Sequence, residues 1–368
     1  MDLVQTIPLI QPYLGKKAQF YIAECLDSNW VSSRGHFIQD FEQMFADFVG
    51  TKHAVAVSNG SVALHLALIC LGIKEGDEVI VPDLTFAATI NAVLHAHATP
   101  VIVDIDPDTW NIAPKNILRA ITKKTKAIIP VHLYGYPCNM DEVMKIARDH
   151  GLRVIEDAAE AHGAEFNKKK VGSFGDVGTF SFYGNKIITT GEGGMCTMND
   201  PDLYERMLVY RDHGMNKQNR YQHDVVGFNY RMTNPQAALG VAQLEEIDSL
   251  LQIRDQLQTW YEAELSNIPG VKLHPKRSMI RPVTWLYTLL IPYRDRLIET
   301  MTREHIETRP MFSPMHRMNI YRQYAPSECP VSISVSERGI SLPTYHDMPL
   351  SYVERVCHVL RKGIHDAG

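Results

Sequence analysis

Short apolar runs recur along the first 200 residues, and stretches with helical character separate most of them. The runs are rich in Val and Ile and cover residues 53–57, 78–82, 100–104, 126–131, 153–156, 178–183 and 194–198. Continuous apolar runs of this length are typical of strands that are buried on both faces of a sheet. Their alternation with helices predicts an α/β fold, in which helices flank both faces of a mostly parallel, seven-stranded sheet.

The chain of 368 residues is long enough for two domains. Helix signals support this division, because residues 61–71 follow Ser58-Asn59-Gly60 and residues 139–150 end at Gly151. After residue 236 the pattern changes to one long helical region, which ends at the turn Asn267-Ile268-Pro269-Gly270. Beyond it we expect a smaller α+β domain with a strand near 284–291, a helix near 294–305, a loop through 310–330 and a closing helix near 350–365. We therefore predict a large domain of residues 1–240, followed by a linking helix and small C-terminal domain of residues 241–368.

The charge and cysteine content narrow the class of partner. A formal net charge of -5 provides no broad basic field, so the sequence argues against nucleic acid and favours a small-molecule partner. The six cysteines lie far apart without a CxxC pair, which argues against a zinc site, or any other metal, and against a disulfide framework. The chain has no secretory pattern at its start and no apolar run of about 18 residues, so we expect a cytoplasmic protein without membrane contact.

Lys186 stands between an apolar run and a Gly-rich turn, in the segment GTFSFYGNKIITTGEGG of residues 178–194. A lysine at the end of a buried strand would have its ammonium desolvated, which lowers the pKa and makes the amine a competent nucleophile toward an aldehyde. Because lysine is usually exposed, the alternative is a surface lysine that only solubilises a loop.

Asp157 follows the run 153–156, on a predicted strand that ends in the two acids Glu156 and Asp157, and would lie at the carboxyl edge of the sheet. Open α/β sheets bind ligands at that edge, and a carboxylate there can keep a pyridinium nitrogen protonated, so that the ring acts as an electron sink. The alternative is a carboxylate that only caps the following turn.

The tetrapeptide Ser58-Asn59-Gly60-Ser61 connects a predicted strand to a predicted helix. Backbone N–H groups at such a helix start form an anion site, where Gly60 would allow close approach and the Ser61 hydroxyl would add a donor to a phosphate. A plain helix N-cap is the alternative. An aldehyde-trapping amine, a strand-end carboxylate and a phosphate cradle are together the three groups that pyridoxal 5'-phosphate requires, so their combination predicts this cofactor.

At these residues the sequence resembles the sugar aminotransferase family of fold-type I pyridoxal phosphate enzymes, the DegT/DnrJ/EryC1/StrS type. The resemblance runs nearly end to end and includes Trp30-Val-Ser-Ser, Ser58-Asn-Gly-Ser61, Gly76-Asp-Glu-Val-Ile-Val-Pro82, Val131-His-Leu-Tyr-Gly135, Glu156-Asp157, Ser181-Phe-Tyr-Gly-Asn-Lys186, Gly191-Glu-Gly-Gly194 and Asn229-Tyr-Arg-Met-Thr233. The family implies an aminotransferase that acts on nucleotide-linked keto sugars.

The resemblance also implies roles for individual residues toward the cofactor. Ser181 and the Gly60 and Ser61 amides would hold the phosphate, Phe86 would stack on the pyridine face, and Asp157 would pair with the ring nitrogen. For Phe86 the sequence itself offers little support, since a lone Phe on an apolar helix is more often a core residue.

Three further residues complete the implied cofactor site. Glu160 would lie near the ring hydroxyl, and Lys186 would carry the cofactor as a Schiff base and act as general base. Asn229 would reach the phosphate of the neighbouring subunit's cofactor, which implies a homodimer with shared active sites. Taken alone, an Asn before Tyr-Arg is more often part of a turn.

The segments 184–195, 227–234 and 307–316 are most similar to family members that aminate C4 of a GDP-linked 4-keto-6-deoxymannose with glutamate as donor. Arg309 and His316 would then be candidates for contacts to the sugar nucleotide or the amino donor. Other activated keto sugars stay open, because specificity depends on a few pocket contacts. Two rivals also remain: a related deoxysugar dehydratase, in which histidine replaces the lysine, and a non-catalytic protein on the same scaffold.

Overall fold

A computed structural model describes residues 6–216 and 218–367 and contains a central sheet of seven strands. Their order in the sheet is β1 (His53–Val57), β9 (Gly194–Met198), β8 (Val177–Ser181), β5 (Arg153–Asp157), β4 (Thr125–Ile128), β2 (Glu78–Pro82) and β3 (Thr99–Val103). Only β9 runs antiparallel to its neighbours in this sheet, β1 and β8. The predicted mostly parallel, seven-stranded sheet is confirmed, with each strand within a few residues of its apolar run.

Helices cover both faces of this sheet, because successive strand residues point to opposite sides. On β2, Val79 and Val81 pack with one group of helices and Ile80 packs with the other. The first group consists of α3 (Gly60–Cys70), α4 (Ala87–His95) and α7 (Pro201–Arg211). The second consists of α2 (His36–Val49), α5 (Pro114–Ala120), α6 (Met140–His150) and α8 (Asn234–Leu244). The strands are therefore buried on both faces, as their apolar runs predict.

Capping residues set the helix boundaries that position the site. α3 begins after Asn59, whose side chain accepts a hydrogen bond from the Val62 N–H at 3.0 Å. α6 begins after Asn139 and ends at Gly151, which has a φ of 64° in the left-handed region that favours glycine. These are the start and stop signals that the sequence shows.

The C-terminal part departs from the prediction both in its helices and in its small sheet. The predicted single helical region is two helices, α8 and α9 (Ile247–Leu265), separated at Glu245-Glu246. The small antiparallel sheet has the order β11 (Tyr287–Leu290), β13 (Gly339–Leu342) and β12 (Arg309–Pro310), and β13 was not predicted. Nor was α11 (Pro330–Arg338), because its Val, Ser and Ile residues carry no strong helix signal.

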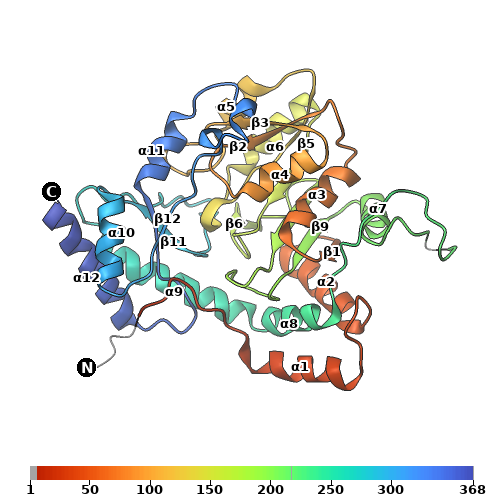
Figure 1. The fold of residues 1–368 in the computed structure, drawn as a ribbon, viewed down its shortest axis with the longest axis horizontal. Coiled ribbons are helices and arrows are strands. Elements are labelled where there is room, and N and C mark those ends of the chain that lie inside the picture. Colours follow the sequence, from red (N-terminus) through yellow and green to blue (C-terminus); the bar gives the residue numbers. More distant parts are fainter. Residues whose placement is uncertain (1–5, 217, 368) are drawn as a thin grey trace.

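Figure 1 shows α9 running from α8, beneath the large sheet, to the small sheet with α10 (Arg294–Arg303) and α12 (Leu350–Ala367). The remaining elements are α1 (Gly15–Asp27), β6 (Glu165–Phe166), β7 (Lys169–Lys170) and β10 (Ile280–Arg281). None of the helices in the described ranges combines the length and the hydropathy needed to cross a membrane. The division of the chain at about residue 240 stays a prediction.

Candidate active site

The carboxyl ends of the parallel strands gather the candidate residues at one edge of the large sheet. Asp157 is the last residue of β5, and Ser181 is the last residue of the neighbouring strand β8. Phe86 lies four residues beyond the end of β2 and immediately precedes α4. This edge is where open α/β sheets bind their ligands.

Lys186 lies in the turn between β8 and β9, with its side chain only 10% exposed. Its Nζ lies 3.8 Å from Glu160 Oε1 and 3.8 Å from the centre of the Trp285 ring. Burial lowers the pKa of the lysine, although the negative charges of Glu160 and Asp157 partly oppose that shift. The predicted desolvation is confirmed, so Lys186 can present a neutral amine more easily than a surface lysine can.

Asp157 is 6% exposed and accepts two hydrogen bonds. The Thr89 hydroxyl donates to Oδ2 at 2.8 Å, and the Ala159 N–H donates to Oδ1 at 3.3 Å. Burial raises the pKa of the carboxyl, and these hydrogen bonds and the charge of Lys186 oppose the rise. Within the described residues Asp157 forms no ion pair, so its charge is offset only by hydrogen bonds and by more distant charges.

Glu160 is also buried, and its Oε2 accepts a hydrogen bond from the Tyr134 N–H at 2.7 Å. Burial raises the pKa of Glu160 to about 7, which places it between its two protonation states near neutral pH. The carboxyl can therefore either donate or accept a hydrogen bond at Oε1, the oxygen that faces Lys186.

Gly60 and Ser181 approach each other closely where α3 begins. A Cβ on Gly60 would lie 2.8 Å from the Ser181 Cβ and 3.2 Å from its Oγ, so only glycine fits without a shift. The adjacent Ser61 is exposed in the first turn of the helix. Backbone N–H groups at the helix start and the Ser181 hydroxyl therefore lie together, as a phosphate site requires.

These observations fit pyridoxal phosphate. The close approach of Gly60 to Ser181 suits a phosphate group, and Asp157 is a buried carboxylate without an ion pair to any residue that the structure describes. Lys186 provides an amine whose charge is disfavoured by burial. The alternatives of a surface lysine and a turn-capping aspartate do not explain why both groups are buried and influence each other electrostatically.

Phe86 and Asn229 differ in how they relate to this group. Phe86 is 59% exposed, so the core position suggested by an apolar helix is wrong, and its ring lies 5.9 Å from that of Phe312. Asn229 is exposed, and its Oδ1 accepts a hydrogen bond from Arg231 Nε at 2.9 Å. The next residue, Tyr230, accepts a bond from the Ser58 N–H at 2.8 Å, which holds this segment near the start of α3. The role of Asn229 toward a neighbouring subunit stays a prediction.

Arg309 and His316, the candidate substrate contacts, lie in different environments. Arg309 is exposed on β12, and its positive charge adds to the lowering of the pKa of Lys186, which burial chiefly causes. His316 is buried, with its Nδ1 2.7 Å from Asp83 Oδ2. Cys329 joins this pair, and donor atoms of the three residues lie within 4.8 Å of one another. The sequence did not predict this group, in which Asp83 and His316 already pair with each other.

Sequence reasoning missed three residues that shape the site. Thr89 bonds to Asp157, and its only sequence signal is a hydroxyl in the apolar helix AATINAVLH. The face of the Trp285 ring contacts Lys186 Nζ, and Trp285 Nε1 donates to the Asn185 carbonyl at 2.7 Å. Tyr134 packs between Trp285 and Phe312, with ring centres 5.9 and 5.4 Å away. No local pattern around Trp285 or Tyr134 predicts these contacts.

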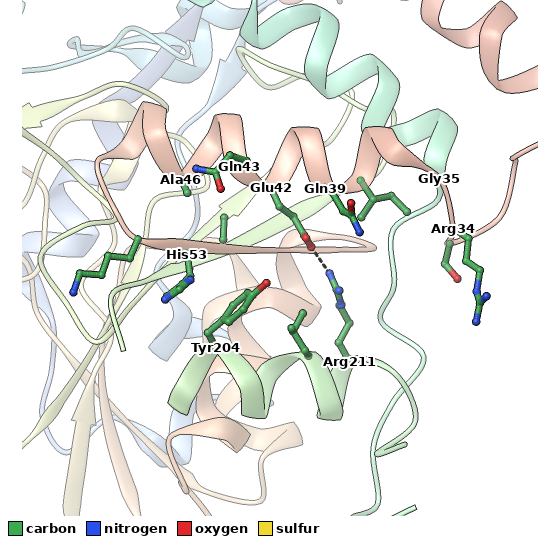
Figure 2. Close-up of a pocket in the computed structure, with 14 residues that line it drawn as sticks. Arg34, Gly35, Gln39, Glu42, Gln43, Ala46, His53, Tyr204 and Arg211 are labelled. Atoms are coloured by element: carbon green, nitrogen blue, oxygen red, sulfur yellow. Dashed lines mark hydrogen bonds and ion pairs between the residues drawn. The ribbon is translucent and has the colours of Figure 1, made fainter. Parts of the chain in front are cut away.

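A separate hollow of about 510 Å³ lies between α2, β1 and α7, and it contains none of the predicted site residues. Figure 2 shows Glu42 and Arg211 pointing toward each other across it. Their ion pair of 2.5 Å is reinforced at β1, where Glu42 accepts from the Ala56 N–H and Arg211 donates to the Ala56 carbonyl. This hollow therefore belongs to the packing of α2 and α7 on β1.

Comparisons with known proteins identify the family to which the chain belongs. Residues 12–361 match the model of the DegT/DnrJ/EryC1/StrS aminotransferase family. The chain is 47% identical to a GDP-perosamine synthase of Caulobacter vibrioides, covering 98% of this chain and 99% of that protein. It is 44% identical to a GDP-perosamine synthase of Escherichia coli O157:H7, with 97% and 98% covered.

Solved structures show the same architecture. The structure of S. venezuelae DesV superposes with a TM-score of 0.92 at 35% identity, covering 97% of this chain and 98% of that one. The family model spans most of the chain and includes every candidate site residue. The chain therefore belongs to the DegT/DnrJ/EryC1/StrS aminotransferase family.

Proposed function

We propose that this aminotransferase uses pyridoxal phosphate to transfer an amino group from glutamate to the C4 keto group of a nucleotide-linked 4-keto-6-deoxyhexose. The substrate we propose is GDP-4-keto-6-deoxymannose, and the product is GDP-perosamine. The observation that carries the chemistry is the convergence of Lys186, Asp157 and the Gly60-Ser181 cradle at one edge of the sheet.

Each residue contributes a defined task. The cofactor, when bound, supplies an aldehyde that accepts the amino group and a ring that withdraws electrons. The Gly60 and Ser61 amides and the Ser181 hydroxyl bind its phosphate, and Asp157 offers its carboxylate to the ring nitrogen. Lys186 would hold the cofactor through its Nζ, and the same amine would serve as the general base that moves a proton. The low exposure of Lys186 and Asp157 excludes water from both proton positions.

Glu160 and Phe86 would complete the cofactor site, with Glu160 near the ring hydroxyl and Phe86 against the face of the ring. Phe86 suits that task because its ring is exposed at the sheet edge rather than packed in the core. Arg309 would contact an anionic group of the sugar nucleotide or the amino donor, since its charge already acts on the lysine side of the site. For His316, whose ring pairs with Asp83, we propose the same class of contact through its Nε2.

Three curated relatives support the choice of substrate, because GDP-perosamine synthases share 41% to 47% identity with nearly the whole chain. We further propose a homodimer with shared sites, in which Asn229 reaches the partner's cofactor. A reducing compartment, the cytoplasm, suits the six buried, unpaired cysteines.

One assay tests the substrate. Purified protein loaded with cofactor is incubated with glutamate and a panel of GDP-, UDP- and dTDP-linked 4-keto sugars, and 2-oxoglutarate formation is measured. A pocket that hydrogen-bonds the guanine edge rejects other bases, because each unpaired buried polar group costs on the order of 1–3 kcal/mol. We expect kcat/KM to be at least about a hundredfold higher for GDP-4-keto-6-deoxymannose. A higher kcat/KM for a UDP- or dTDP-linked sugar would show that the proposed substrate is wrong, but it would still support the proposed transamination.

A further inference from the structure

Two buried threonines on α4 and the turn before it form a chain of hydroxyls that ends at Asp157. Thr85 and Thr89 are both fully buried. Their Oγ1 atoms lie 2.9 Å apart, and Thr89 Oγ1 lies 2.8 Å from Asp157 Oδ2. Thr85 precedes the N-cap residue Phe86, and the turn into α4 brings its hydroxyl to that of Thr89 in the first turn of the helix.

The direction of the hydrogen bonds follows from the number of protons available. An ionised carboxylate only accepts, so Thr89 donates its single proton to Asp157. Thr89 must then accept from Thr85, whose proton completes the chain. When Asp157 carries its negative charge, each of the two hydroxyls donates one hydrogen bond, over 2.9 Å from Thr85 and 2.8 Å from Thr89.

Hydrogen bonds that run in the reverse direction, from Asp157 to Thr85, would lack a good final acceptor. If Oδ2 carried a proton and donated it to Thr89, Thr89 would donate to Thr85, and Thr85 would need an acceptor of its own. The acceptor that the structure offers is the Phe86 carbonyl at 3.4 Å, a distance typical of a weak hydrogen bond. A neutral carboxyl with its proton on Oδ1 could still accept from Thr89 at Oδ2, but an anion is the stronger acceptor, so the donated hydrogen bond favours the ionised carboxylate.

A hydrogen bond that favours the ionised form of Asp157 matters because the neighbouring groups have opposing effects on its charge. Burial disfavours its charge, whereas Lys186 and His132 favour it. Glu160 carries a carboxyl that interacts unfavourably with it. A buried neutral hydroxyl that donates a hydrogen bond stabilises the Asp157 carboxylate without adding a competing cation.

We propose that Thr89, supported by Thr85, is a positioning residue that keeps Asp157 ionised and fixed in orientation, so that the ring nitrogen of the cofactor stays protonated. This inference rests on the proposed use of pyridoxal phosphate. Thr89 touches neither substrate nor cofactor in this account, because it acts through Asp157.

The test uses the full-length protein loaded with cofactor labelled with ¹⁵N at the ring nitrogen. Thr89→Val removes the hydroxyl with little change of shape, Thr89→Ser keeps the hydroxyl, and Thr85→Val removes only the second donor. Thr197→Val is the matched control, because Thr197 is also buried but its hydroxyl donates to the Gly172 carbonyl at 2.6 Å, away from Asp157. The readouts are the ¹⁵N resonance between about pH 6 and 9 and the separate values of kcat and KM.

We expect the wild type, Thr89→Ser and Thr197→Val to keep a protonated ring nitrogen over this range. Thr89→Val should lose that proton within the range and show kcat at least about tenfold lower, with KM changed far less. Thr85→Val should shift in the same direction by a smaller amount, which preserves the test if Thr89→Val does not fold.

Two results would overturn the inference. One is a ring nitrogen in Thr89→Val that stays protonated as in Thr197→Val, and the other is an unchanged kcat. If the proposed use of pyridoxal phosphate is itself wrong, the wild type will bind no cofactor through Lys186. That outcome can be distinguished from failure of the inference about Thr89.

Discussion

Glu160 shows how burial at a single residue links the site to the stability of the protein. Its pKa is raised from 4.5 to about 7, chiefly by desolvation. A raised folded-state pKa provides stability below the unfolded-state value of 4.5, and this stability is lost as pH rises through about 7. The cofactor-free protein therefore loses stability near neutral pH because a buried carboxyl has to ionise.

Glu160→Gln should remove this loss, since the amide oxygen still accepts from the Tyr134 N–H and cannot ionise. Relative to wild type, the cofactor-free variant should gain up to about 3 kcal/mol between pH 4.5 and pH 8, with the gain concentrated around pH 5 to 7. Urea unfolding across this pH range measures the difference. A difference that does not change with pH would show that Glu160 has the same pKa in both states.

Gly60 governs the width of the phosphate cradle. Gly60→Ala would place a Cβ 2.8 Å from the Ser181 Cβ, so the helix start must move away from the strand end. We expect the Kd for pyridoxal phosphate to rise at least about tenfold, a loss of ~1.4 kcal/mol, while the fold is retained. Fluorescence titration measures the Kd, with Gly184→Ala as control because its Cβ would meet only the Gly191 carbonyl at 4.0 Å. Equal affinities of the two variants for pyridoxal phosphate would show that Gly60 is not part of the phosphate site.

At the scale of elements, α8 and α2 pack through a glycine. A Cβ on Gly240 would lie 2.4 Å from the tip of the buried Phe41 ring. Helix propensity favours alanine over glycine by about 1 kcal/mol, but overpacking a core costs about 1–3 kcal/mol. We expect Gly240→Ala to destabilise the protein, which chemical unfolding can measure.

A double-mutant cycle separates these two effects at Gly240. Phe41→Leu shortens the facing side chain, so Gly240→Ala should cost less in that background than in the wild type. Equal costs in both backgrounds would show that Phe41 is not the source of the strain.

Elements could be predicted where local and tertiary signals agree. The run of residues 153–156 becomes part of β5 because Val154 and Ile155, at successive positions, supply the apolar side chains that a strand buried on both faces needs. The small sheet was harder, since β13 gains its position from pairing with β11 and β12 rather than from its own four residues. Likewise, Lys186 and Asp157 could be proposed from their flanking strands, whereas Trp285 reaches Lys186 only through the packing of the small sheet.

At the scale of the whole molecule, the proposed shared sites predict complementation between two defective chains. In a mixed dimer of Lys186→Ala and Asn229→Ala chains, one site would combine an intact Lys186 with an intact Asn229 of the partner chain. Refolding an equal mixture makes about half of the dimers mixed, so about a quarter of wild-type activity should appear. Transaminase activity of the mixture is compared with that of each variant alone. Activity no greater than the mean of the two separate variants would contradict shared sites.

The central claim is that Lys186 holds pyridoxal phosphate covalently, and borohydride reduction tests it most directly. The cofactor-loaded protein is reduced and digested, and its peptides are analysed by mass spectrometry, with Lys186→Ala treated in parallel. We predict a single pyridoxyl-modified peptide that contains Lys186, and no modified peptide from the variant, because burial disfavours the charge of the Lys186 amine. A wild-type protein without this adduct, or with the adduct on a different lysine, would contradict the account.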